Sequence, residues 1–187
     1  MPVSLLDRGG VRVFPGLGLC PACFHGVPGG CTRGHPFLLV AARAGQARVV
    51  AATLERFGRL DILVNAAGTH KIIETDKLAP EDWNRVIGVN LTGSFFCAQA
   101  AAPIMRDQGG GKIINIGSVM SRVGMPKRVA YASSKGGVVL LTRSLAQDWG
   151  PWKINVNAIA PGFFRTAMNE QLFQDQAWVD HLVGRIA

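Results

Sequence analysis

The sequence lacks the features that mark secreted, membrane-spanning or nucleic-acid-binding chains. Its longest apolar stretches are far shorter than the ~18–20 residues that cross a bilayer. Glycine and proline interrupt the one early apolar stretch, Val13 to Phe24, so no signal peptide is expected. The net charge of +8 is not gathered into a basic cluster or helix stripe. We therefore expect a cytoplasmic protein with neither a membrane nor a nucleic-acid partner.

Cysteine and tyrosine are scarce. Three of the four cysteines lie within the first 31 residues, and without secretion a disulfide framework is not expected. With His25 and His35 they leave a zinc site as an alternative for residues 20–35, but the spacing fits no zinc finger, and we expect no metal. The only tyrosine is Tyr131, so a proton transfer that uses a phenol must use this residue.

The composition divides the chain near residue 45. Residues 1–45 are rich in glycine, proline and cysteine, so we expect an irregular segment with one short helix at Phe37–Ala44. Residues 46–187 are orderly, with amphipathic stretches alternating with short apolar runs. The predicted helices are Val49–Phe57, Pro80–Met105, Val129–Trp149 and about Thr166–Val183, and the predicted strands are Leu60–Val64, Lys112–Ile116 and Ile154–Ile159.

The alternation of strands and helices predicts an α/β fold with a parallel sheet. In such sheets, ligands bind beyond the carboxyl ends of the strands. Each predicted strand is followed there by small or turn-forming residues, namely Asn65–Gly68, Gly117-Ser118 and Ala160–Gly162. We therefore expect a ligand site where these turns meet.

Four polar residues near these turns are candidates for chemistry. Tyr131 and Lys135 are four positions apart near a predicted helix start, so they project from one face. A free phenol is a poor base at neutral pH, and a nearby ammonium favours the phenolate. Ser118 can donate to a substrate carbonyl, and Asn90, inside Asn-Leu-Thr-Gly, predicts a local helix distortion. Each feature alone is more often a surface or turn residue.

Together, these residues resemble the short-chain dehydrogenase/reductase family over roughly residues 47–187. The motifs are Asn65-Ala66-Ala67-Gly68, Asn90, Ser118, Tyr131-Ala132-Ser133-Ser134-Lys135, and Pro161-Gly162 with Thr166 four residues later. The resemblance implies a Rossmann-like, doubly wound parallel sheet with helices on both faces. It also implies an oxidoreductase that transfers hydride between NAD or NADP and a secondary alcohol or ketone.

The resemblance also assigns roles to the catalytic candidates. Tyr131 would be the general acid/base, and Lys135 would favour its phenolate form and hold the ribose of the nicotinamide. Ser118 would orient the substrate oxygen. Asn90 would anchor a water that links Lys135 to solvent.

Further residues would line the binding sites. The adenosine side of the cofactor would meet Asn65, Ala66 and Gly68, and its nicotinamide side Pro161, Gly162 and Thr166. The sequence also resembles members that act on gluconate and related sugar acids. That likeness would place three polar residues against a carboxylate or hydroxyls: His70, Arg165 and Asn169.

The sequence departs from the family at both ends. The family opens with a glycine-rich T-G-x-x-x-G-x-G turn, and the nearest stretch here is Gly29–Pro36, with proline in place of the third glycine. The family also usually continues beyond the point where this chain stops. We therefore expect an incomplete domain, and the alternative to an enzyme is an inactive dinucleotide-fold fragment that serves as an interaction module. A complete member would be a dimer or tetramer built through helices Pro80–Met105 and Val129–Trp149.

Overall fold

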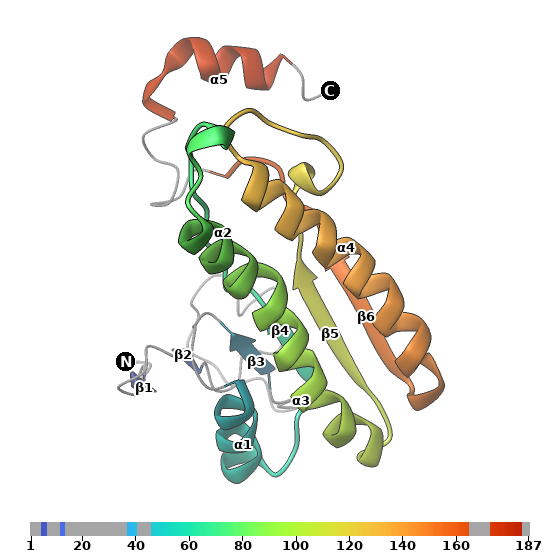
Figure 1. The fold of residues 1–187 in the computed structure, drawn as a ribbon. Helices are drawn as coiled ribbons and strands as arrows, with labels where there is room; N and C mark the ends of the chain where they lie inside the picture. The colour runs from blue at the N-terminus through green and yellow to red at the C-terminus, as the bar shows by residue number, and fades with distance from the viewer. Residues whose placement is uncertain (1–4, 7–11, 14–36, 41–45, 165–172, 185–187) are drawn as a thin grey trace.

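A four-stranded parallel sheet forms the centre of the fold (Figure 1). The computed structural model describes residues 5–6, 12–13, 37–40, 46–164 and 173–184. The sheet has the order β3-β4-β5-β6, with β3 at Phe37–Val40, β4 at Ile62–Asn65, β5 at Gly111–Ile116 and β6 at Ile154–Ile159. Two further strands, β1 (Leu5–Leu6) and β2 (Arg12–Val13), pair with each other antiparallel.

The helices α1, α3 and α4 lie side by side on one face of this sheet (Figure 1). Their bounds are Gln46–Phe57 for α1, Gly93–Asp107 for α3 and Val129–Trp149 for α4. The helix α2 (Pro80–Ile87) continues into α3 through a π-helical turn, η3 (Gly88–Thr92). The last described helix is α5 (Gln176–Val183), and single 3-10 turns occur at η2 (Thr75–Lys77), η4 (Val119–Ser121) and η5 (Gly150–Trp152).

Local sequence sets several helix ends. Helix α2 starts with Pro80 at its first position, where the missing amide hydrogen costs nothing, and acidic residues follow in its first turn. Helix α1 stops at Gly58, whose φ of +71° a residue with a side chain rarely adopts. Helix α5 is capped by Asp175, whose Oδ1 accepts the amide hydrogen of Trp178 at 3.1 Å.

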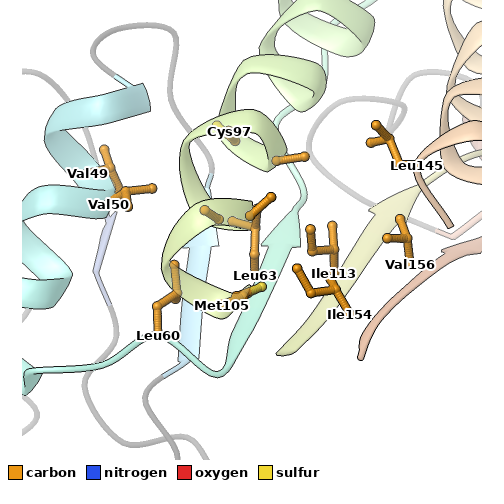
Figure 2. Close-up of a cluster of buried hydrophobic side chains, with 13 residues drawn as sticks. Val49, Val50, Leu60, Leu63, Cys97, Met105, Ile113, Leu145, Ile154 and Val156 are labelled. Carbon is orange, nitrogen blue, oxygen red and sulfur yellow. The ribbon is translucent and has the colours of Figure 1, made fainter. Parts of the chain in front are cut away.

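The hydrophobic core lies between the sheet and this helical layer (Figure 2). Leu63, Ile113 and Val156 occupy matched positions on β4, β5 and β6, so their side chains form a row across the sheet. Met105 of α3 and Leu145 of α4 cover this row from the helical side. The core thereby fixes the strand ends beneath the start of α4.

The predicted parallel α/β sheet is confirmed, and the predicted helix over 129–149 and strand over 154–159 match α4 and β6. The predicted helix at Phe37–Ala44 is wrong, because residues 37–40 form β3 and pair with β4. Short apolar runs do not distinguish strand from helix, and here pairing with the edge of β4 decides. The last helix is also shorter than predicted, since the capping Asp175 lies outside it and the helix begins at Gln176.

Three expectations about the wider architecture have different outcomes. A Rossmann-like parallel sheet with helices on both faces was expected, and among the described residues α1, α3 and α4 cover one of these faces. The division of the chain near residue 45 stays a prediction, although β3 lies on its N-terminal side and belongs to the sheet. Within the described ranges, no helix has the length and apolar character needed to span a bilayer.

Candidate active site

The loops that follow β4, β5 and β6 lie together because these strands are neighbours in a parallel sheet. The amide of Gly117, after β5, donates to the carbonyl of Ile159 at 2.7 Å. The amide of Val119 donates to the carbonyl of Pro161, after β6, at 3.1 Å. A methyl group on Gly117 would lie 3.2 Å from the Ile159 oxygen, so only glycine fits this junction comfortably. The turns singled out in the sequence therefore meet at one edge of the sheet.

Tyr131 and Lys135 lie on the first turns of α4, beside this edge. Lys135 is buried, and its Nζ lies 5.8 Å from the centroid of the Tyr131 ring. The same Nζ donates a hydrogen bond of 2.6 Å to the carbonyl oxygen of Ile116, at the end of β5. Burial lowers the pKa of Lys135 from 10.5 to about 8. The structure therefore brings the Lys135 ammonium close to the Tyr131 ring, and their catalytic pairing stays a prediction.

Asn90 occupies the middle of the π-helical turn η3 and is fully buried. Its Oδ1 accepts the amide hydrogen of Thr69 at 2.8 Å, and its Nδ2 donates to the Thr69 carbonyl and to Ser134 Oγ, both at 2.9 Å. The predicted helix distortion at this position is confirmed. Asn90 therefore joins the loop after β4 to helix α4.

Gly68 brings the loop after β4 against both Asn90 and Lys135. A methyl group at Gly68 would lie 3.8 Å from Asn90 Oδ1 and 4.0 Å from Lys135 Nζ. Ala66 and Gly68 are exposed, Gly162 is exposed with open space above its Cα, and Pro161 is half-buried. At these positions the backbone is accessible and is not covered by large side chains. A dinucleotide could therefore approach the backbone closely here.

Ser118 lies two residues after the end of β5 and is the N-cap residue of the turn η4. Its Oγ accepts the amide hydrogen of Met120 at 3.2 Å, and its own amide donates to Ser121 Oγ at 3.0 Å. These two contacts form a reciprocal cap that fixes the Ser118 side chain. Its hydroxyl hydrogen is not used in any hydrogen bond among the described residues, so it remains available for a ligand oxygen.

Asn65 begins a buried polar chain that the sequence did not indicate. Its Nδ2 donates to Asn115 Oδ1 at 2.8 Å and to the carbonyl of Ser94 at 3.2 Å, and Asn115 donates in turn to Thr142 Oγ1 at 2.9 Å. Asn65 Oδ1 is the one buried side-chain polar atom without a hydrogen-bond partner in the described parts of the chain. The Asn65 side chain thus points into the core, and Ala66 and Gly68 provide the accessible surface after β4.

His70 lies beside Tyr131, and its predicted role in substrate binding stays a prediction. Their ring centroids are 6.3 Å apart in an edge-to-face arrangement. Burial lowers the pKa of His70, and the positive charges of Arg128 and Arg85 lower it further. The other residues expected in the outer site, Arg165, Thr166 and Asn169, lie outside the described residues, as do those of the glycine-rich stretch 29–36 and of the alternative zinc site.

Arg128 is another residue near the site that the sequence analysis did not single out. It occupies the N-cap position of α4, three positions before Tyr131, and it is buried. The signal that could have identified it is its spacing, because a side chain three positions away on a helix start lies near its partner. No group of metal-ligating side chains occurs in the described residues.

Comparison with known proteins identifies the relatives of this chain. The sequence model of the short chain dehydrogenase family matches residues 37–177. Gluconate 5-dehydrogenase from Gluconobacter oxydans is 38% identical over 136 residues, which cover 73% of this chain and 53% of that protein. A 3-oxoacyl-[acyl-carrier-protein] reductase from a Synechocystis species is 40% identical over 125 residues, covering 67% of this chain and 51% of the reductase.

A solved structure gives the same result. The crystal structure of a gluconate 5-dehydrogenase from Burkholderia cenocepacia, in complex with NADP and tartrate, superposes with a TM-score of 0.73 at 40% identity. The match covers 76% of this chain and 56% of that one, and the chain spans about half the length of the curated relatives it matches. The match of the family model over most of the sequence is decisive, and the chain belongs to the short chain dehydrogenase family.

Proposed function

We propose that this chain carries the acid–base half of an NAD(P)-dependent oxidoreductase that interconverts a secondary alcohol and a ketone. The observation that carries the proposal is the Tyr131–Lys135 pair, whose ammonium is buried 5.8 Å from the phenol ring at the carboxyl edge of the sheet. The buried ammonium places a positive charge beside the phenol, which is the group that would exchange a proton with the substrate. Family membership supports the same chemistry.

The proposed roles divide the proton work among three side chains. Tyr131 takes the proton of the substrate hydroxyl during oxidation and returns it during reduction. Ser118 donates its free hydroxyl hydrogen to the same substrate oxygen, because its other contacts already fix its position. Lys135 would stabilise the phenolate and hold the ribose of the cofactor. When bound, the nicotinamide supplies or accepts the hydride.

Asn90 acts by position in this scheme. Both of its amide hydrogens are already donated, to the Thr69 carbonyl and to Ser134 Oγ. A water that links Lys135 to solvent would therefore be held through an Asn90 oxygen, which can accept a second hydrogen bond. The water-anchoring role predicted for Asn90 remains a proposal.

The cofactor would lie along Ala66 and Gly68 on its adenosine side and along Pro161 and Gly162 on its nicotinamide side, with Thr166 continuing the latter. NAD and NADP both remain open. The gluconate 5-dehydrogenase of known structure was crystallised with NADP and tartrate. This supports testing NADP as the cofactor and a sugar acid as the substrate of this chain. We further propose a cytoplasmic homo-oligomer, for which the exposed Phe96 of α3 and Leu140 of α4 offer apolar contact surface.

The test is oxidation of polyols and sugar acids by the full chain with NAD and with NADP. Tyr131→Phe keeps the ring and removes the hydroxyl, so we expect turnover to fall at least ~100-fold while the melting temperature is retained. Wild-type turnover that survives this substitution would refute the mechanism. Titration with NADH and NADPH tests the alternative, because a wild-type chain that binds neither cofactor is an inactive fragment.

A further inference from the structure

Arg128 is a largely enclosed cation with no counterion among the described residues. The residue is 9% exposed, its guanidinium nitrogens still reach solvent, and no hydrogen bond or ion pair joins them to any described residue. Burial lowers the pKa of Arg128, yet a guanidinium stays protonated in proteins. Buried charges are normally paired, because an unpaired charge carries the full cost of leaving water. An unpaired guanidinium that is largely enclosed but still accessible is suited to binding an anion.

Two carboxylates in the neighbouring segments are already engaged by other cations. Asp82 is shared by Lys71, at 2.9 Å, and Arg85, at 3.0 Å. Glu74 pairs with Lys127 at 2.7 Å. The loop after β4 and the loop before α4 thus hold more cations than carboxylates among the described residues, and the surplus positive charge includes Arg128.

The position of Arg128 favours an anion as well. It is the N-cap residue of α4, a helix of 21 residues with no acidic side chain in its first turn. The free amide hydrogens and the dipole of a helix start attract negative charge. Arg128 comes three positions before Tyr131, and its positive charge lowers the pKa of His70, whose ring centroid lies 6.3 Å from that of Tyr131, so the guanidinium lies near both rings.

We propose that Arg128 binds the carboxylate of the substrate and thereby makes this site selective for hydroxy acids over neutral alcohols. A guanidinium presents two parallel N–H groups that match a carboxylate. His70 would complete the contact as a neutral hydrogen-bonding ring, which binds hydroxyls without adding charge. This inference rests on the proposed function, since it places the reacting carbinol at Tyr131.

The test compares gluconate with glucitol, a neutral polyol of the same length, in the full chain. In Arg128→Gln we expect kcat/KM for gluconate to fall about 10- to 100-fold, mainly through KM, and that for glucitol to change less than about 3-fold. Arg128→Lys should fall in between, because it keeps the charge and loses the fork. Arg143→Gln, on an exposed arginine of the same helix, should match the wild type.

A second readout does not depend on turnover. Gluconate should shift the ring resonances of His70 in the NMR spectrum of the wild type and of Tyr131→Phe, and should leave them unmoved in Arg128→Gln. Equal losses for gluconate and glucitol, or a gluconate shift that survives Arg128→Gln, would overturn the anion site. A changed KM for the cofactor alone would also overturn it, because the anion would then be a cofactor phosphate.

The two proposals can fail separately. If wild type turns over alcohols but Arg128→Gln treats gluconate and glucitol alike, the anion site is wrong and the oxidoreductase stands. If no alcohol is oxidised while gluconate still shifts His70 through Arg128, the oxidoreductase is wrong and the anion site stands. The melting temperature of Arg128→Gln should not fall, because the substitution removes an unpaired buried charge; a marked loss would indicate a structural role instead.

Discussion

Replacement of Lys135 by methionine measures how much the buried cation lowers the free energy of unfolding. Lys135 is 4% exposed, and its pKa is lowered by burial from 10.5 to about 8. The hydrogen bond to the Ile116 carbonyl offsets only part of this cost. Methionine has a similar length and shape but carries no charge. Wild type and Lys135→Met therefore differ chiefly in the protonation of residue 135.

The sign follows from proton binding. Below pH ~8 the ammonium is present in both folded and unfolded chains, and the folded chain bears the full burial cost. Between about pH 8 and pH 10.5 the folded chain has released a proton that the unfolded chain still holds, so the free energy of unfolding rises with pH. A fall in pKa from 10.5 to about 8 corresponds to roughly 3 kcal/mol.

The assay is urea unfolding of wild type and Lys135→Met at several pH values from 7 to 10. The free energy of wild type minus that of the variant should rise by about 2–3 kcal/mol across this range, because the other titrating groups cancel. Lys77→Met, on an exposed lysine, controls for the loss of a lysine from the chain. A difference that stays flat from pH 7 to pH 10 would refute the burial argument.

Two further predictions concern the packing that supports the site. Asn115→Ala should lower the free energy of unfolding by about 2–3 kcal/mol in urea titrations, because Asn65 and Thr142 lose a buried partner. Asn157→Ala, at an exposed position of β6, should lower it by less than about 0.5 kcal/mol. Equal effects would contradict the buried network. Gly136→Ala should stabilise α4 by up to ~1 kcal/mol, because alanine is the better helix former. Gly137→Ala should be less stable than Gly136→Ala by about 1–3 kcal/mol, because the added methyl group at position 137 would lie 2.7 Å from Leu91 Cδ2. Adding Leu91→Ala should remove the steric clash of Gly137→Ala, and a double variant without this recovery would refute the close packing of α4 on η3.

The sequence predicted the parts of the fold that carry a long or repeated signal. Helix α4 and strand β6 follow from sustained periodicity and a buried apolar run, and their predicted bounds match. The distortion at Asn90 follows from poor helix formers in the middle of a helix. The Tyr131–Lys135 pair follows from spacing alone, because a helix fixes which residues share a face.

The remaining features depend on contacts that a linear sequence does not show. Strand β3 is too short for periodicity, and its identity comes from pairing with β4. The Asn65–Asn115 contact requires the register of two strands that lie 50 positions apart in the chain. The spacing of Arg128 from Tyr131 places it near the site, but its burial without a counterion among the described residues is visible only in the structure.

The π-helical turn η3 gives the number of residues in this segment a meaning of its own. A π turn holds one residue more than the α-helical turn it replaces, and each residue of an α-helix rotates the following side chains by roughly 100°. Deleting one residue within Gly88–Thr92 would therefore turn either α2 or α3 relative to the sheet, even if every remaining side chain were unchanged. An insertion or deletion here would therefore disturb the packing of a whole helix, just as substitution of Asn90 would disturb the site. Alignments of this segment are constrained by helical phase as well as by residue identity.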